Sequence, residues 1–310
     1  MEKQLGLDGK EQIEAYGIEP FIQKCKESVW KYKGEWERMS QRVGFWADMD
    51  DPYITYTDEY IESVWWSLKQ VADKGLLYKG HKVVPYCPRC GTALSSHEVS
   101  QGYKTVKEVS AFVRFQVKGQ SDTWLYAWTT TPWTLPSNVA LCVNPTDTYA
   151  RVAWQGQTVI MGKALLESVL GPEALDNILE EMPGSALVGM AYEPLFDFQK
   201  DLVDKSAWRV VADDYVTMTD GTGIVHIAPA FGEDDARVGR ENDLPFLQLV
   251  DTQGRMDKAT PWAGLFVKDA DRPILEKLEA DGLLVKTARF EHDYPFCWRC
   301  DTPLIYYARS

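Results

Sequence analysis

Residues 1–80 carry apolar side chains at helical spacing. Steps of four and three residues over residues 18–43 keep one face apolar, with Pro20 suited to a first helical turn and Gly34 a candidate break, which predicts one helix or two in series. A further helix is expected from an N-cap at Thr57 to a stop at Gly75. We expect this helix to bury its apolar face, which consists of Ile61, Val64, Trp65, Leu68 and Val71.

From about Tyr103 the period of the apolar positions changes from helical to two, which is typical of half-buried strands. The predicted strands are residues 111–117, 125–128, 139–143, 149–154, 158–161, 208–211 and 224–228. Short helices are predicted at residues 163–170, 173–182, 234–241 and 271–280. The fold class is therefore expected to be α+β, with a β-barrel-like domain that follows a helical segment.

Two Cys-x-x-Cys pairs flank this β-rich region: Cys87 with Cys90, and Cys297 with Cys300. Each loop offers two thiolates, and a tetrahedral Zn²⁺ takes four ligands, so the pairs are predicted to share one zinc ion. The alternative is a pair of redox dithiols or ordinary reduced cysteines. A shared site predicts three parts: a helical segment of residues 1–80, a zinc-binding stem of residues 81–102 and 287–310, and an inserted domain of residues 103–286.

Composition narrows the classes of function. The chain has 310 residues, which suggests about two domains at roughly 150 residues each. No apolar stretch approaches the roughly 20 residues of a membrane span, and the N-terminus is too polar for a signal peptide, so a cytoplasmic protein without membrane contact is expected. The net charge of −13 argues against a broad electrostatic grip on nucleic acid, so any such contact must be local.

Two segments carry candidate chemistry. Residues 128–138 are rich in threonine and contain two prolines that cannot continue a sheet ladder. Residues 221–235 combine a glycine turn, a strand with His226, and three acids that begin a helix. Taken alone, the first could be a loop without a ligand, the acids could compensate the helix dipole, and His226 could be a core residue. No Ser-His-Asp or Cys-His arrangement is evident, so a covalent nucleophile is not expected.

Taken together, these residues resemble the isoleucyl-tRNA synthetases, in the part of that class I family that contains the editing (connective peptide) domain. The resemblance is carried by residues 60–66, 80–90, 128–134, 221–235 and 294–300. Trp-Thr-Thr-Thr-Pro-Trp-Thr at residues 128–134 is more similar to the isoleucyl branch than to the valyl branch. The His-x-Gly-His and Lys-Met-Ser-Lys-Ser elements that hold ATP in the family are absent, so the chain looks like a fragment that cannot activate isoleucine alone.

The resemblance implies an aminoacyl-tRNA deacylase within an isoleucine-tRNA ligase, acting in protein biosynthesis. A pocket that admits isoleucine cannot exclude valine, because one methylene is worth about 1–3 kcal/mol, a case for which isoleucyl-tRNA synthetases are the standard example. The implied partners are the 3′ end of tRNA(Ile) carrying valine and the remainder of the synthetase chain, and a monomer is expected. Residues 1–80 would then belong to or flank the catalytic region.

The resemblance also implies roles for individual residues. Asp235 matches the acid that holds the aminoacyl ammonium group, and His226 matches the residue that limits side-chain size. The predicted catalytic residues are Asp235, Thr129, Thr131 and His226, and the predicted substrate-binding residues are Thr130, Trp133, Thr134 and Asn138. Hydrolysis is expected to use a positioned water. Two alternatives stay open: an editing-inactive, zinc-stabilised structural or tRNA-binding module, and a free-standing deacylase.

Overall fold

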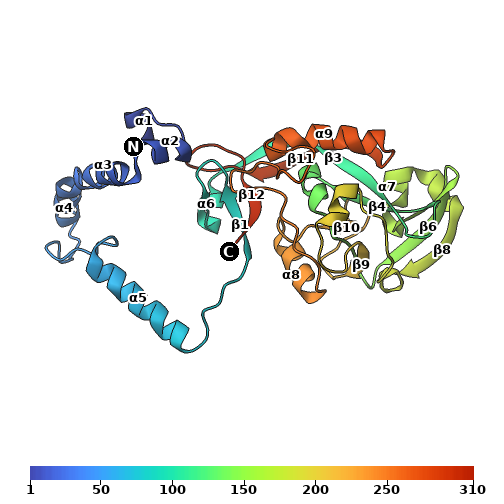
Figure 1. Cartoon of the computed structure of the whole chain (residues 1–310), viewed down its shortest axis with the longest axis horizontal. Helices are drawn as coiled ribbons and strands as arrows, with labels where there is room; N and C mark the ends of the chain where they lie inside the picture. Colours follow the sequence, from blue (N-terminus) through green and yellow to red (C-terminus); the bar gives the residue numbers. More distant parts are fainter. The chain divides into compact units, whose positions relative to one another are not determined.

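The computed structural model describes residues 1–310, which divide into two units. One unit comprises residues 1–81 and the other residues 82–309 (Figure 1). No helix of either unit combines the length and the apolar character needed to cross a bilayer. The chain contains both helices and strands, with the strands only in the second unit. This confirms the mixed α+β class predicted from the sequence.

The first unit is entirely helical. Its helices are α1 (Glu2–Leu5), α2 (Lys10–Tyr16), α3 (Ile18–Trp30), α4 (Lys33–Arg42) and α5 (Asp58–Asp73). The predicted pattern over residues 18–43 is thus two helices in series, and the chain breaks at Lys31 and Tyr32, just before Gly34. The predicted N-cap at Thr57 is also confirmed.

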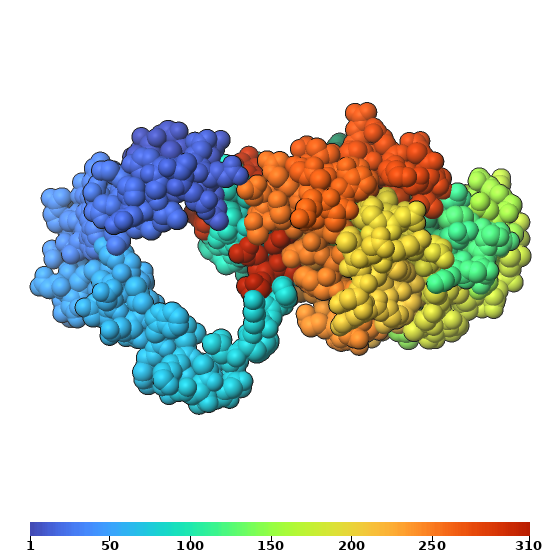
Figure 2. Space-filling model, viewed as in Figure 1, coloured from blue at the N-terminus to red at the C-terminus, as the bar shows by residue number.

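The burial predicted for these helices is wrong within this chain. No residue of α1 to α5 is buried, and the five residues of α5 that were predicted to be buried are all at least 40% exposed. The helices follow one another along the unit (Figure 1), and the space-filling view shows residues 1–81 as an extended run of chain (Figure 2). An amphipathic pattern encodes a face that needs a partner, and it does not say that the partner lies in the same segment.

The second unit begins and ends in a small three-stranded sheet. Its strands, in the order β12-β1-β2, are β1 (Lys82–Cys87), β2 (Thr92–Ala93) and β12 (Ile305–Arg309). The short helix α6 (Ser96–Ser100) follows, and it starts with a capping box in which the Ser95 hydroxyl accepts from the Glu98 amide. Cys87, Leu94, Val99, Cys297 and Leu304 form a separate small core here.

A long two-stranded ribbon connects this small sheet to the main sheet. Its antiparallel strands are β3 (Tyr103–Gln116) and β11 (Leu284–Pro295) (Figure 1). A Cβ atom at Gly102 would lie 2.0 Å from the Phe296 carbonyl oxygen, so glycine allows the ribbon to join the small sheet closely. Sequence alternation predicted only the second half of β3 and missed β11, in which Pro295 alone is buried.

The main sheet curls into a half-barrel. Its strands run in the order β8-β6-β7-β4-β10-β5-β9, with β3 paired to β4. The bounds are β4 (Thr123–Thr129), β5 (Ala140–Val143), β6 (Thr148–Trp154), β7 (Gln157–Gly162), β8 (Ile178–Pro183), β9 (Arg209–Ala212) and β10 (Ile224–Ile227). Residues 191 and 192 bridge to β9 and to the end of β3, and Phe115, Leu125, Leu141 and Tyr192 fill the enclosed core.

Helices cover the outside and the ends of the half-barrel. They are α7 (Leu166–Leu170), α8 (Glu233–Glu241) and α9 (Val267–Ala280), with 3₁₀ turns η1 (Pro132–Ser137), η2 (Lys163–Leu165), η3 (Pro172–Asn177), η4 (Gly184–Leu187) and η5 (Asp197–Asp201). The helix predicted over residues 173–182 is wrong: η3 is followed by β8. Pairing with β6 makes β8 the edge strand of the sheet and overrides its local helical preference.

Candidate active site and cysteine cluster

The two predicted chemical segments leave the sheet at the same edge. Strands β4 and β10 are parallel neighbours, with Val225 opposite Trp128. Their carboxyl ends therefore lie together, and the Thr-rich segment after β4 faces the loop after β10. The segments meet at two points: Thr134 contacts His226, and the Trp133 ring packs edge-on against Phe231 at 5.1 Å between centroids.

The threonine hydroxyls form a connected chain. Oγ1 of Thr129 lies 3.3 Å from Oγ1 of Thr131, which lies 3.3 Å from Oγ1 of Thr134. The Thr131 amide donates to Thr129 Oγ1 at 3.0 Å, and the Thr134 hydroxyl donates to the Thr131 carbonyl at 2.8 Å. Each hydroxyl has one proton, and these protons are used in the hydrogen bonds among the threonines. The lone pairs that remain on Thr129 and Thr131 can accept hydrogen bonds from a bound group.

His226 is neutral at pH 7 and lies next to the threonine hydroxyls. The Thr134 hydroxyl has two groups within reach, the Thr131 carbonyl at 2.8 Å and the His226 Nε2 at 3.0 Å, and the tautomer of His226 sets which of the two side chains donates in the second contact. Burial lowers the His226 pKa to about 4. Its Nδ1 is buried without a hydrogen-bond partner.

This geometry differs from a catalytic triad, although Thr134 and His226 are in contact. A base in a triad accepts the nucleophile proton at one nitrogen and is oriented by a carboxylate at the other. Here no carboxylate reaches Nδ1, which is buried without a hydrogen-bond partner. His226 can therefore shape the site but is poorly suited to act as a general base at neutral pH.

Asp235 lies in the first turn of α8, with its carboxylate turned toward the end of β10. Its Oδ2 accepts from the Ala228 amide at 3.0 Å. Burial raises the Asp235 pKa to about 7, and the neighbouring charge of Asp234 adds to this effect, although part of the side chain remains accessible. A Cβ atom at Gly232 would lie 2.7 Å from the Asp235 carboxyl carbon, so the preceding backbone approaches this group closely.

Sequence reasoning missed a second buried carboxylate, Asp271 on α9. Its Oδ1 accepts from the Trp133 amide at 2.8 Å and so fixes the start of η1. Burial raises the Asp271 pKa to about 7. The sequence places Asp271 in an ordinary amphipathic helix, with no signal that it reaches the Thr-rich segment 138 residues away.

Asn138 and Thr130 differ in how the structure uses them. Asn138 is fully buried: its Nδ2 donates to the Ala140 carbonyl at 2.9 Å, and its Oδ1 accepts from the Tyr192 hydroxyl at 2.8 Å. These bonds engage both ends of the amide within the protein and hold the end of η1. Thr130 is partly exposed beside the hydroxyl chain. Substrate contact by either residue stays a prediction.

A groove of about 710 Å³ lies between α9 and the β3–β11 ribbon. None of the predicted site residues lines it, but Asp271 does. Lys268, on the groove wall, pairs with Glu108 at 2.6 Å. Asp271 therefore lines the groove while its Oδ1 accepts from the Thr-rich segment.

The four predicted metal ligands come together, as the sequence indicated. The sulfur atoms of Cys87, Cys90, Cys297 and Cys300 all lie within 4.8 Å of one another. The Cys90 amide donates to Cys87 Sγ at 3.3 Å, and Cys87 and Cys297 are buried. All four cysteines are free, and four thiolates complete the ligand set of a tetrahedral zinc, so the residues present fit this ion.

The two cysteine loops are built alike. The residue after each second cysteine is left-handed: Gly91 has φ 66° and Asp301 has φ 63°. The amides of these residues donate to the carbonyls of Cys87 and Cys297, at 2.9 and 2.8 Å. This repeat, Cys-Pro-Arg-Cys-Gly-Thr and Cys-Trp-Arg-Cys-Asp-Thr, presents the cysteine pairs in equivalent turns.

Comparison with known proteins identifies relatives along the whole chain. An isoleucine–tRNA ligase of Clostridium novyi is 57% identical over 100% of this chain, which covers 30% of that ligase. The isoleucine–tRNA ligase of Clostridium acetobutylicum has the same identity and coverage, and that of Bacillus thuringiensis is 50% identical over 99% of this chain and 29% of its own length. The chain thus spans about a third of the length of these relatives.

Two solved structures with distant sequences also resemble this chain. The structure described as GlLeuRS-CP1 is 15% identical with a TM-score of 0.47, covering 58% of this chain and 99% of that structure. The editing domain of the P. knowlesi cytosolic leucyl-tRNA synthetase is 13% identical with a TM-score of 0.46, covering 62% and 98%. At TM-scores below 0.5, these likenesses carry no functional inference. The family of class I tRNA synthetases (I, L, M and V) matches residues 1–304, and the chain belongs to this family.

Proposed function

We propose that this chain is the editing part of an isoleucyl-tRNA synthetase, which hydrolyses mischarged Val-tRNA(Ile). The observation that carries the proposal is the meeting of the two chemical segments at one sheet edge, where Thr134 contacts His226 and Asp235 lies against Ala228. Full-length isoleucine–tRNA ligases are its sequence relatives, and ligation itself would need the ATP-binding parts that this sequence lacks.

Asp235 would bind the ammonium group of the aminoacyl ester. A carboxylate orients that group by a charge-assisted hydrogen bond and leaves the ester carbonyl open to attack. Bringing a cation to Asp235 would also favour its ionised form and so offset the effect of burial. The accessible part of the side chain allows this approach.

The attacking water would be held by the threonines. Thr129 and Thr131 offer oxygen lone pairs, so they accept the protons of a water and leave its own lone pair for the ester carbonyl. Thr130, Trp133 and Thr134 would contact the terminal adenosine and the amino-acid side chain, and Asn138 would support them through its buried hydrogen bonds. The water oxygen bonds to the ester carbonyl carbon, the bond from that carbon to the ribose oxygen breaks, and the ribose oxygen takes a proton of the water, which yields free valine and tRNA.

Selection by size would fall to His226. The ring is held by its hydrogen bond to Thr134 and is 7% exposed, so it cannot easily swing away from a longer side chain. The extra methylene of isoleucine would then meet the ring, whereas valine would fit. The 3′ end of tRNA(Ile) and the rest of the synthetase chain are the partners that this function requires.

The cysteine cluster would hold one structural zinc ion. Cys87, Cys90, Cys297 and Cys300 would supply all four ligands, which leaves no open position for substrate. When bound, the ion would link the turn after β1 to the loop between β11 and β12 by metal coordination. The cluster lies at the far end of the β3–β11 ribbon from β4, so the ion takes no part in hydrolysis.

Single-turnover deacylation of a valyl ester of adenosine tests the proposal. Loss of a desolvated charge partner costs about 2–5 kcal/mol, so Asp235→Ala should slow the reaction by about 30-fold or more. Glu233→Ala is the matched control, because Glu233 is an exposed acid in the same first turn of α8. Short esters are preferable to whole tRNA, because the net charge is −13.

The rates of the parent chain and of the two variants decide whether Asp235 has the proposed role. A loss in Asp235→Ala with normal activity in Glu233→Ala supports the proposed role. A rate for Asp235→Ala within tenfold of the parent chain would exclude that role. A parent chain that binds the ester without hydrolysing it would favour the alternative of an editing-inactive binding module.

A further inference from the structure

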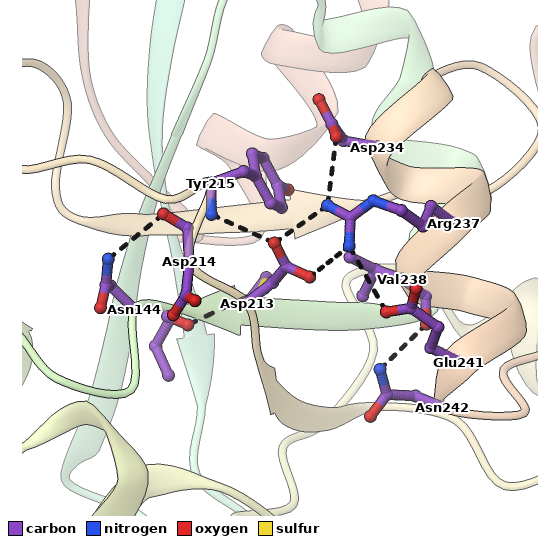
Figure 3. Close-up of polar contacts among 11 residues, drawn as sticks. Asn144, Asp213, Asp214, Tyr215, Asp234, Arg237, Val238, Glu241 and Asn242 are labelled. Atoms are coloured by element: carbon purple, nitrogen blue, oxygen red, sulfur yellow. Dashed lines mark hydrogen bonds and ion pairs between the residues drawn. The ribbon is translucent and has the colours of Figure 1, made fainter.

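An ion pair anchors α8 near Asp235. Arg237, two residues further along the helix, forms a bidentate salt bridge with Asp213: Nη1 lies 2.6 Å from Oδ2 and Nη2 lies 2.9 Å from Oδ1 (Figure 3). Arg237 also reaches the more exposed Asp234 and Glu241, at 3.2 and 3.4 Å. Paired, parallel hydrogen bonds of this kind fix orientation as well as distance.

Asp213 is itself fixed to the sheet. It follows β9 directly, and its amide donates to the Val143 carbonyl at the end of β5 at 3.0 Å. Its Oδ1 also accepts from the Tyr215 amide at 3.1 Å, and its side chain is only 13% exposed. Hydrogen bonding to Arg237 lowers the Asp213 pKa, so the carboxylate stays ionised at neutral pH.

Arg237 and Asp235 therefore hold α8 at two separate points. Residues two apart lie on different faces of a helix, so one contact goes to the end of β9 and the other to the end of β10. The fit at Asp235 is tight, because the backbone at Gly232 leaves no room even for a Cβ atom. A small rotation of α8 would remove the carboxylate from the Ala228 amide.

We propose that Arg237 is a positioning residue of the hydrolytic site. Its bidentate salt bridge with Asp213 fixes the rotation of α8 and so keeps Asp235 in place. The inference rests on the proposed function only in that Asp235 acts there on a substrate. Arg237 itself acts through the helix and touches neither the ester nor the water.

Two readouts test this, one of geometry and one of activity. In Arg237→Met, hydrogen exchange at the Ala228 amide should accelerate at least tenfold, while exchange at the Val139 amide, which donates to Ile227 within the sheet, stays unchanged. Deacylation of the valyl ester should fall about tenfold in kcat/KM. Asp213→Asn should reproduce both effects and provides a second route if Arg237→Met folds poorly.

The controls separate positioning from general stability. Lys205→Met removes another ion pair beside α8, to Asp243 at 2.5 Å, and should change neither readout. In an Asp235→Ala background, Arg237→Met should cause no further loss of activity. In a chain that keeps Asp235, Arg237→Lys should retain part of the activity that Arg237→Met loses.

Unchanged exchange at Ala228, or equal acceleration at Ala228 and Val139, would overturn the positioning role. Additive losses of activity from Asp235→Ala and Arg237→Met would also overturn it. If the parent chain failed to hydrolyse the ester, the proposed function would fall, and the exchange measurement would still decide whether Arg237 positions Asp235.

Discussion

At the scale of single residues, the site combines two carboxylates that are costly to ionise with one histidine that stays neutral. Burial raises the pKa values of Asp235 and Asp271 to about 7 and lowers that of His226 to about 4. Asp235 accepts a hydrogen bond from the backbone amide of Ala228, and Asp271 accepts one from the backbone amide of Trp133. Perturbed pKa values of this kind are typical of functional sites.

The raised pKa of Asp235 predicts a pH-dependent effect on stability. An acid whose pKa is higher in the folded state than in the unfolded state stabilises the fold at low pH, and that contribution is lost as the pH rises through the folded value of about 7. Asp235→Asn removes the ionisation. Its free energy of unfolding relative to the parent should therefore increase by about 2–3 kcal/mol between pH 5 and pH 8.

Chemical denaturation at these two pH values measures the change. Asp271 has a shift in the same direction but is present in both proteins, so its contribution cancels in the difference. A relative stability that stays constant with pH, or that falls as the pH rises, would show that Asp235 is not held in desolvating surroundings.

At the scale of elements, the spacing of apolar and polar residues predicted those helices and strands that depend on local sequence. Alternation located β4, β6 and β10, and the acids of the first turn located α8. The helix expected at residues 173–182 failed because β8 gains its hydrogen bonds from β6, which local sequence does not show. The residues Thr134 and His226 could be named from sequence, but their contact depends on the parallel pairing of β4 with β10. Asp271 and Arg237 were missed for the same reason, since their partners lie in distant segments.

The cysteine cluster gives an element-scale prediction. The chain as purified without chelator should contain one zinc ion per molecule, and the double variant Cys297→Ser, Cys300→Ser should lose it because two ligands cannot complete a tetrahedral site. The half-barrel should stay folded, since its core is separate from the small core around the cysteines.

Elemental analysis and thermal unfolding measure these two effects. Cys142→Ser serves as the matched control, because Cys142 is a free cysteine in β5 outside the cluster and its replacement should leave the zinc content unchanged. Parent protein without zinc, or a double variant that keeps its metal, would contradict the assignment.

At the scale of the whole molecule, the two units differ in what they bury. Residues 82–309 contain every buried residue of the chain, whereas the helices of residues 1–81 expose large apolar side chains such as Trp36 and Trp65. The sequence predicted these helices correctly and their burial wrongly, because a face needs a partner that the pattern does not identify. Stability and hydrolysis should accordingly belong to the second unit.

The most direct test of the central claim is the ratio of single-turnover deacylation rates for valyl and isoleucyl esters of adenosine. The parent chain should hydrolyse the valyl ester and spare the isoleucyl ester. His226→Ala should begin to hydrolyse the isoleucyl ester while keeping part of its valyl activity, because the ring that crowds the longer side chain is gone. An unchanged ratio in His226→Ala, or a parent chain that hydrolyses both esters alike, would contradict the account.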